Sequence, residues 1–171
     1  MSSHLLPDNF DSKVTLKKGD YLFCAGDINT VLYYIVNGCV QLYILDQSEE
    51  RIIRFGYKGS YICALDSLLT QLPTIYYLQA IRQTEVLISS KENTTLLLQD
   101  IEGIKQLLLQ FQEREIDLLT EAPIDRYKRV LERSPLLFQE VPQRYIAKYL
   151  RMTPETLSRL KKLDLNQDLE L

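Results

Sequence analysis

Near the C-terminus, the stretch RMTPETLSRLKK at residues 151–162 places a carboxylate and several cations on one short predicted helix. Glu155 and Arg159 are four residues apart, so they lie on the same face of that helix. A guanidinium can bind guanine through O6 and N7, and a carboxylate can accept a hydrogen bond from the N4 amino group of cytosine. These residue types at this spacing predict contacts with base edges in the major groove of DNA.

The same stretch carries the signals of a helix start. Thr153 is a good N-cap, Pro154 suits the first turn, and Glu155 lies near the positive end of the helix dipole. We expect the exposed side of this helix to carry Pro154, Glu155, Thr156, Ser158, Arg159 and Lys162. Phosphate contacts, which position a protein on DNA without specifying its sequence, are assigned to Arg144, Lys148, Lys161 and Lys162. Arg151 and Thr153 complete the predicted DNA-binding set.

A second helix is expected just before this one, and the pair matches a twenty-residue helix-turn-helix pattern that begins at Gln143. Apolar residues occupy the positions at which two crossing helices bury side chains, and a small residue occupies the point of closest approach: Ile146, Ala147, Leu150, Met152, Leu157 and Leu160. The turn position that favours glycine and positive φ holds Arg151, at a cost of about 1 kcal/mol. An arginine there can also reach a phosphate. A helical surface that binds a protein partner is the alternative.

Charge is distributed unevenly along the 171 residues, whose formal net charge is -3. Residues 1–122 contain ten Lys/Arg and sixteen Asp/Glu, which gives −6. Residues 123–163 contain ten and four, which gives +6, and the last eight residues add −3. A basic segment that includes the predicted helix pair is typical of a polyanion-binding region. An ordinary solvated helical face is the simpler alternative.

Between about residues 14 and 88, short β-rich runs such as YLFCA, VLYYIV and CVQLYIL alternate with glycine or polar residues. Strands this short with turns this frequent predict a small antiparallel sandwich or barrel. Asn37-Gly38 lies between two of these runs and predicts a β-hairpin. After Ser90 a helical period takes over, and helices are expected at about residues 92–98, 100–119, 123–133, 143–150 and 154–163.

The expected helix at residues 100–119 has apolar residues at alternating steps of three and four. They are Ile101, Ile104, Leu108, Phe111 and Leu118, with Glu115 at the one polar position. This pattern is nearly three heptads and is typical of a seam between two copies of a helix, so we expect a homodimer. Packing of this stripe on the β region is the alternative, and Leu107 and Leu109 lie off the seam.

Two parts of the chain resemble the bacterial Crp/Fnr family of transcription regulators. They are LKKGDYLFCAGDINTVLYYIVNGCVQLY in the β region, and IDRYKRVLERSP with VPQRYIAKYLRMTPETLSRLKK in the tail. The resemblance implies an α+β fold with an N-terminal antiparallel β-roll, a jelly-roll-like double-stranded β-helix, at residues 1–98. A long dimerisation helix at residues 99–121 and an all-helical helix-turn-helix domain at residues 122–171 would follow.

Two details of the tail bear on DNA reading. Glu155 and Arg159 match the Glu-x-x-x-Arg pair with which family members read the major groove, whereas Pro154 replaces an arginine that often precedes the glutamate. We therefore expect this chain to prefer a different base sequence from family members that have this arginine. The last residues, DLNQDLEL, are acidic and not strand-like, so we expect the family's two-stranded wing to be absent or minimal.

Family members that bind cyclic AMP have a phosphate cassette, in which a Gly-Glu pair binds the ribose and a later Arg-Ser or Arg-Thr pair neutralises the phosphate. This chain has Cys63-Ala64 and Thr74-Ile75 at the corresponding places. Without the arginine an anionic phosphate loses a charge-assisted interaction, so we expect no tight binding of cyclic AMP or cyclic GMP. The degenerate pocket is either filled by its own side chains or open to an uncharged or aromatic ligand. Its expected lining residues are Tyr61, Cys63, Ala64, Thr74, Ile75 and Tyr76.

Composition argues against several other classes of protein. His4 is the only histidine, and Cys24, Cys39 and Cys63 lack the spacing of a zinc or iron–sulfur site, so we expect no metal, no other cofactor and no enzyme. No apolar run approaches the roughly 18 residues that cross a membrane. The N-terminus lacks the basic and apolar regions of a secretory signal, so we expect a cytoplasmic protein.

The sequence is interpreted as a homodimeric, sequence-specific DNA-binding transcription regulator. Its expected partners are double-stranded DNA, a second copy of the chain and, as a further candidate, RNA polymerase, and its effector is not identified. The alternative is a ligand- or protein-interaction module that has a degenerate cyclic-nucleotide-binding domain and does not bind DNA.

Overall fold

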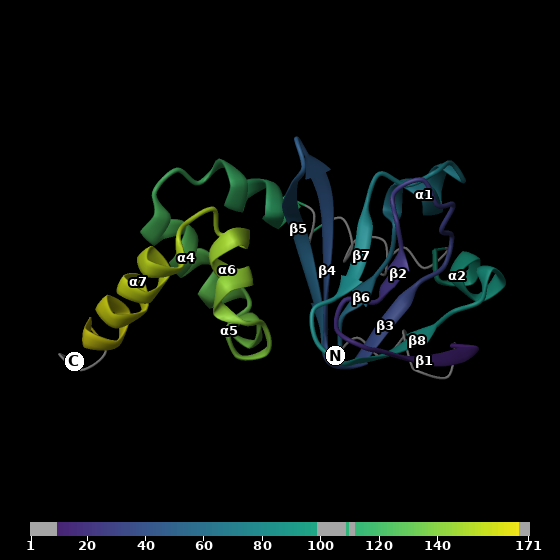
Figure 1. Cartoon of the computed structure of the whole chain (residues 1–171), viewed down its shortest axis with the longest axis horizontal. Helices are drawn as coiled ribbons and strands as arrows, with labels where there is room; N and C mark the ends of the chain where they lie inside the picture. The colour runs from purple at the N-terminus through teal and green to yellow at the C-terminus, as the bar shows by residue number, and fades with distance from the viewer. Residues whose placement is uncertain (1–9, 99–108, 110–111, 168–171) are drawn as a thin grey trace. The chain divides into compact units, whose positions relative to one another are not determined.

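The computed structural model describes residues 10–98, 109 and 112–167 of the chain. The chain divides into two compact units, an N-terminal unit at Met1–Phe111 and a C-terminal unit at Gln112–Leu171 (Figure 1). Every strand of the described residues lies in the N-terminal unit, whereas the C-terminal unit contains α4 to α7.

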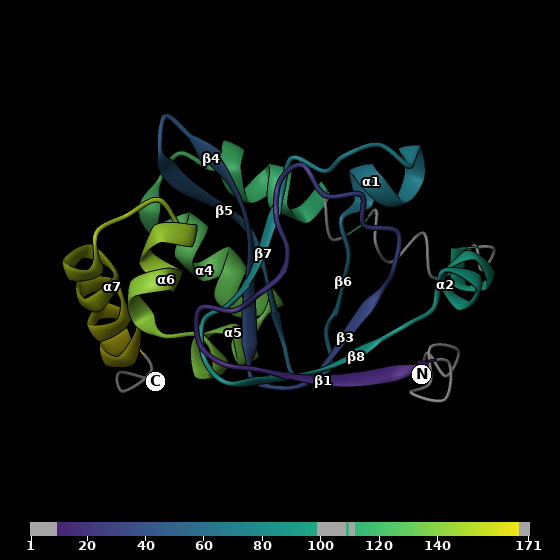
Figure 2. The ribbon, with the colours of Figure 1, turned by 45° about the vertical axis from the view of Figure 1, so that its right-hand side comes forward.

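Two antiparallel four-stranded sheets form the N-terminal unit, in the orders β1-β8-β3-β6 and β2-β7-β4-β5. The first sheet contains β1 (Ser12–Leu16), β3 (Tyr33–Asn37), β6 (Tyr61–Ile62) and β8 (Thr84–Ile88). The second contains β2 (Tyr21–Phe23), β4 (Cys39–Asp46), β5 (Glu49–Tyr57) and β7 (Tyr77–Ala80). Figure 2 shows β1, β8 and β3 side by side in the first sheet. These antiparallel sheets, followed by helices, confirm the expected α+β fold.

The core of the N-terminal unit contains apolar side chains of both sheets. Alternate residues of a strand face the same side, so Val40 and Leu42 of β4 both point inward and are buried. Ile35 and Val86 from the other sheet pack in the same cluster. A smaller cluster of Leu32, Cys63 and Leu68 forms around α1 (Leu65–Thr70). Full burial of each such aliphatic side chain stabilises the fold by about 1.5–3 kcal/mol.

The predicted hairpin at Asn37-Gly38 is wrong. β3 ends at Asn37 and pairs with β6 and β8, whereas β4 begins at Cys39 and pairs with β5 and β7, so the chain changes sheets at Gly38. Gly38 has φ +95°, and a Cβ there would lie 2.5 Å from Gln83 O and from Thr84 Cα. The Asn-Gly pair indicates positive φ, which this corner needs as much as a hairpin does.

The hairpin of the second sheet joins β4 to β5 through Gln47 and Ser48, which have φ values of 48° and 70°. Both central residues have positive φ, as a two-residue type I′ turn requires, although neither is glycine. Arg51 pairs with Asp46 and Glu49 on either side of this turn. The N-terminal unit also contains α2 (Lys91–Leu98), which begins one residue before the predicted helix.

The C-terminal unit is helical. Residues 112–119 are helical, and α4 (Pro123–Arg133), α5 (Pro135–Glu140), α6 (Gln143–Tyr149) and α7 (Pro154–Gln167) follow. α4, α5 and α7 begin at proline, which is tolerated at the first helical position because the N–H there has no intrahelical acceptor. The sequence pattern does not predict α1 or α5, because six residues are too few to show a helical period.

The predicted dimer seam lies largely outside the described residues, which include neither Ile101 and Ile104 nor Leu108 and Phe111. At the C-terminal end of the seam, Leu118 is half-buried. Its neighbours Ile116 and Leu119 are 38% and 79% exposed. The division of the chain into residues 1–98, 99–121 and 122–171 stays a prediction.

Candidate nucleic-acid interface

The turn between α6 and α7 ends α6 with a left-handed residue. Arg151 has φ 53°, as the helix-turn-helix pattern requires at this position. Arg151 N–H donates to Lys148 O over 3.2 Å, and Met152 N–H donates to Ala147 O over 3.0 Å. These two bonds form a Schellman motif, in which glycine is the usual left-handed residue. The chain therefore folds this turn around an arginine, at a cost of about 1 kcal/mol.

The apolar positions of the helix-turn-helix pattern lie in the interior of the C-terminal unit. Ile146, Leu150 and Leu157 are fully buried, and Ala147 is 1% exposed. The small side chain of Ala147 lets α6 approach its neighbour closely. Met152 and Leu160 are half-buried. The burial pattern is the one that the sequence predicts for two crossing helices.

The N-terminus of α7 is capped as the sequence predicts. Thr156 N–H donates to Thr153 Oγ1 over 3.2 Å, which satisfies one of the donors that lack an intrahelical acceptor. A hydrogen bond from its own backbone N–H lowers the pKa of the exposed Glu155, with smaller contributions from Thr153 and from the positive charge of Arg159. Glu155 is thus held as a carboxylate that is available to accept hydrogen bonds.

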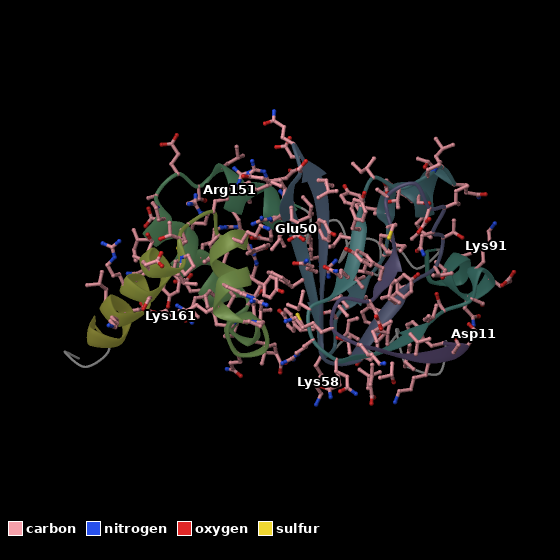
Figure 3. The ribbon with its side chains drawn as sticks, in the orientation of Figure 1. Asp11, Glu50, Lys58, Lys91, Arg151 and Lys161 are labelled. Carbon is pink, nitrogen blue, oxygen red and sulfur yellow. The ribbon has the colours of Figure 1, made fainter. Side chains whose placement is uncertain are left out.

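The predicted DNA-binding residues divide into two groups by exposure. Thr156, Ser158 and Lys161 are half-buried. The exposed group contains Arg144, Lys148, Arg151, Thr153, Pro154, Glu155, Arg159 and Lys162. Figure 3 labels Arg151 at the turn before α7 and Lys161 on α7. The C-terminal unit therefore presents exposed cations on α6, on the turn and on α7.

Two of the predicted phosphate contacts also interact with aromatic rings. Lys161 Nζ lies 5.5 Å from the ring centroid of Phe138. The Arg144 guanidinium lies 4.7 Å from the ring centroid of Tyr145 and donates to its hydroxyl over 3.1 Å. A cation over a ring gains roughly 0.5–1 kcal/mol at an exposed site. Each of these two cations can therefore interact with an aromatic ring of its own unit instead of with a phosphate.

Three arginines that the sequence reasoning counted in the basic segment serve the interior of the C-terminal unit. Arg133 Nη2 lies 2.6 Å from Asp117 Oδ2, and Arg129 Nε lies 3.2 Å from Asp117 Oδ1. Arg129 and Arg133 also pair with Glu113, and the Asp117 side chain is fully buried. The third, Arg126, is 7% exposed. Their roles depend on which residues fold against α4, which the local sequence does not show.

The N-terminal unit contains the predicted pocket residues around α1. Cys63, Ala64 and Thr74 are buried, Tyr61 and Tyr76 are half-buried, and Ile75 is 61% exposed. Burial raises the pKa of the Cys63 thiol to about 11, so this thiol is protonated at neutral pH.

Asp66 joins two of the predicted pocket residues, Thr74 and Ile75, and the sequence reasoning missed it. Thr74 Oγ1 donates to Asp66 Oδ1 over 2.8 Å, and Ile75 N–H donates to Asp66 Oδ2 over 2.9 Å. Ser67 N–H donates to Asp66 Oδ1 over 2.8 Å. The Asp66 carboxylate thus accepts the hydrogen bonds that the donors of this turn could otherwise give to a ligand. Its sequence signal, an acidic residue in the first turn of a six-residue helix, is too common to indicate this role.

Residues 13–100, just over half of the chain, match the family model of the cyclic nucleotide-binding domain. The chain belongs to the cyclic nucleotide-binding domain family. Within it the chain is Crp/Fnr-like, as the resemblance in sequence implies and as its likeness in fold to solved members bears out. No curated protein sequence matches the chain.

Solved structures share the fold of this Crp/Fnr-like chain at low sequence identity. FixK2 from Bradyrhizobium japonicum is 19% identical with a TM-score of 0.70, over 92% of this chain and 85% of that one. A Crp-family transcriptional regulator from Thermus thermophilus is 17% identical with a TM-score of 0.65, over 91% and 85%. The c-di-GMP-responsive global regulator CLP from Xanthomonas campestris is 16% identical with a TM-score of 0.60, over 94% and 89%.

Two further findings concern the part of this Crp/Fnr-like chain that the structure describes. No three of its histidine, cysteine, aspartate and glutamate residues are grouped as metal ligands. None of its helices is both long and apolar enough to cross a membrane.

Proposed function

We propose that the chain is a homodimeric, sequence-specific DNA-binding transcription regulator of the Crp/Fnr type, and that cyclic AMP is not its effector. The observation that carries the proposal is the α6–turn–α7 geometry, in which Glu155 and Arg159 are exposed on a capped helix. The solved structures of similar fold include a Crp-family transcriptional regulator from Thermus thermophilus and the global regulator CLP, which supports a regulatory role.

The distribution of charge supports DNA over a protein partner. Arg126, Arg129 and Arg133 are engaged inside the C-terminal unit, whereas exposed cations lie on α6, the turn and α7. Phosphate contacts release counterions, so DNA affinity should fall steeply with salt. A dimer would place two copies of α7 in major grooves about one helical turn apart and read a roughly palindromic site.

The deciding experiment is a selection of bound sites from a random DNA pool. We expect enrichment of a palindromic sequence, and a mobility shift on that sequence that weakens with salt. Lys148→Gln should weaken binding to all sequences and reduce the salt slope by about 1, because a phosphate contact carries no sequence information. A pool that shows no enrichment, or a shift that does not depend on salt, would contradict the proposal.

Dimerisation is tested separately. Leu108→Glu introduces a charge into the predicted seam, and we expect it to convert a dimer into a monomer in light scattering. Glu115→Gln, at the polar position of the same pattern, is the control and should leave the dimer intact. A wild-type chain that is monomeric at micromolar concentration would contradict the proposed dimer.

The exclusion of cyclic AMP rests on Ala64, Thr74 and Asp66. Ala64 is fully buried and carries no group for a ribose hydroxyl, and Thr74 supplies no charge for a phosphate. The Asp66 carboxylate accepts hydrogen bonds from Thr74 and Ile75, so an anionic ligand would meet a like charge there. We expect no heat of binding when cyclic AMP is titrated into the chain by calorimetry. Binding in the micromolar range would overturn this part of the proposal.

A protein-interaction module is the second candidate, and one observation favours it. Four aliphatic side chains near the α1 end of the N-terminal unit are 61–66% exposed: Ile28, Leu69, Leu72 and Ile75. Exposed apolar groups gathered in one region are typical of a surface that binds protein. The DNA selection separates the two candidates, since this module would enrich no sequence. RNA polymerase is a candidate partner only for the regulator.

A further inference from the structure

The two backbone hydrogen bonds of the Schellman motif at the C-terminal end of α6 do not reach the three carbonyl groups that follow. The Schellman motif satisfies the carbonyls of Ala147 and Lys148, through Met152 N–H and Arg151 N–H. The next three carbonyls along the chain belong to Tyr149, Leu150 and Arg151. A helix end buried without partners for such groups is unfavourable, so their acceptors need side-chain donors.

Two buried arginines donate to these three carbonyls. Arg126 Nε donates to Leu150 O over 2.6 Å, and its Nη2 lies 3.5 Å from Arg151 O. Arg114 Nη2 donates to Tyr149 O over 3.1 Å, and its guanidinium lies 3.7 Å from the ring centroid of Tyr149. Arg114 and Arg126 are 8% and 7% exposed. The whole end of α6 is thus closed by two guanidinium groups.

Arg126 also binds the segment that leads out of the helix at residues 112–119. Its Nη1 donates to Thr120 O over 2.6 Å and approaches Glu121 O at 3.4 Å. One planar guanidinium therefore joins the connection before α4 to the turn before α7. Arg114 lies on the helix at residues 112–119 itself, so it makes a second link between that helix and the end of α6.

The chemistry of arginine suits this place and that of lysine does not. Its five N–H donors lie in one plane and reach several acceptors in fixed directions, whereas an ammonium group is a compact point charge. A cation at the C-terminus of α6 also interacts favourably with the negative end of the helix dipole. Replacement by lysine keeps the positive charge and removes the planar set of N–H donors.

We infer that Arg126 and Arg114 are positioning residues for DNA reading. They hold the strained turn at Arg151 in its left-handed conformation, and they make α7 move as one body with the end of the helix at residues 112–119. This inference rests on the proposed function for its effect on DNA. The contacts themselves lie within the C-terminal unit and can be tested without DNA.

The first test compares Arg126→Lys with Arg129→Lys in the full chain. Both arginines lie on α4, one turn apart, but Arg129 pairs with Glu113 and Asp117 rather than with the turn. We expect hydrogen exchange at the amides of Arg151 and Met152 to become about tenfold faster in Arg126→Lys, because local opening of the turn is easier. Arg129→Lys should leave these amides as protected as in the wild type.

The second readout is the ratio of affinities for a selected DNA site and a scrambled one of equal length. We expect Arg126→Lys to lower this ratio about tenfold, the effect of one misaligned base contact. Loss of stability alone would reduce the active fraction and leave the ratio unchanged. Arg114→Lys removes the guanidinium that donates to Tyr149 O but leaves the bonds of Arg126 to Leu150 and Arg151 in place. It should show both effects more weakly, so it carries the test if Arg126→Lys does not fold.

A rescue variant separates turn positioning from general stability. Glycine adopts positive φ without strain, so Arg151→Gly in the Arg126→Lys background should restore protection at Met152 and recover the affinity ratio. Unchanged exchange and ratio in Arg126→Lys, or equal changes in Arg129→Lys, would overturn the inference. If the wild type binds no DNA, the proposed function fails, and the exchange measurements still decide whether Arg126 holds the turn.

Discussion

The hydroxyl group of Thr74 donates a hydrogen bond to Asp66 Oδ1 over 2.8 Å, in the turn where the family resemblance places a phosphate-binding arginine. Thr74 is also held through its backbone, because its N–H donates to Asp27 O and its carbonyl accepts from Gly26 N–H. The turn is therefore organised around a carboxylate of the chain. An anionic effector at this turn would meet the like charge of Asp66, and the Thr74 hydroxyl and Ile75 N–H already donate to that carboxylate.

Asp66→Ala should destabilise the N-terminal unit. Its carboxylate accepts hydrogen bonds from Ser67 N–H, Thr74 Oγ1 and Ile75 N–H, and the loss should lower the free energy of unfolding by about 2 kcal/mol. Urea unfolding followed by circular dichroism measures the change. Asp20→Ala is the control, since the exposed Asp20 carboxylate accepts a hydrogen bond from Lys17 N–H within an exposed turn. Equal effects of both substitutions would show that Asp66 has no special role.

Arg159→Ala should relax base preference at one position. Arg159 is exposed on α7, one turn after Glu155, and a well-aligned arginine–guanine contact contributes about 1–3 kcal/mol. Affinity for the selected site should fall by that amount, while affinity for a site altered at the contacted base should change little. Lys162→Gln is the control and should weaken both sites equally. An unchanged profile on every sequence would refute the role of Arg159.

Gly38→Ala should disrupt the corner between the two sheets. A Cβ at Gly38 would lie 2.5 Å from Gln83 O and Thr84 Cα, and φ is +95°, so strain and overpacking together should cost about 2–4 kcal/mol. Gly26 provides a matched control with φ +97° and no heavy atom within 4 Å of the added Cβ. Gly26→Ala should cost only about 1 kcal/mol. Similar urea midpoints for the two variants would contradict this account of Gly38.

The C-terminal unit should lose stability in alkali through Tyr127. Burial raises the pKa of Tyr127 from its ordinary 10.0 to about 12, with further contributions from Asp164, whose Oδ2 accepts from the Tyr127 hydroxyl over 3.3 Å. The unfolded chain loses this proton first, so the stabilisation is complete below about pH 10 and is lost as pH rises towards about 12. Tyr127→Phe should therefore flatten the decline in unfolding free energy between these pH values. A decline as steep as in the wild type would exclude Tyr127 as its cause.

The helix-turn-helix could be predicted from the sequence because its determinants are local. The spacing of Ile146, Leu150 and Leu157 places them on facing sides of two short helices, and Thr153 lies within three residues of the donor it caps. The positive φ at Arg151 follows from the same pattern, even though the residue is not glycine. A small antiparallel sandwich or barrel was also predicted from strand length and the frequency of turns, and the family resemblance implied a β-roll.

The connection at Gly38 and the role of Asp66 could not be predicted in this way. Asn37-Gly38 determines backbone conformation, but whether the flanking strands pair with each other depends on β5, β7 and β8, which lie elsewhere in the sequence. Asp66 is eight residues from Thr74, and only the fold of the intervening helix and turn brings the two side chains together.

The sequence by itself determined that antiparallel strands are followed by helices, that Glu155 and Arg159 are exposed together, and that the tail is basic. These features depend on short-range periodicity and composition. Only the tertiary structure decided which cations face outward. Arg126 and Arg133 look like surface cations in the sequence. In the structure Arg126 donates to the carbonyl oxygens of Thr120 and Leu150, and Arg133 pairs with the carboxylate of Asp117. A guanidinium takes whichever acceptors the fold brings within about 3 Å, and those acceptors come from distant parts of the chain.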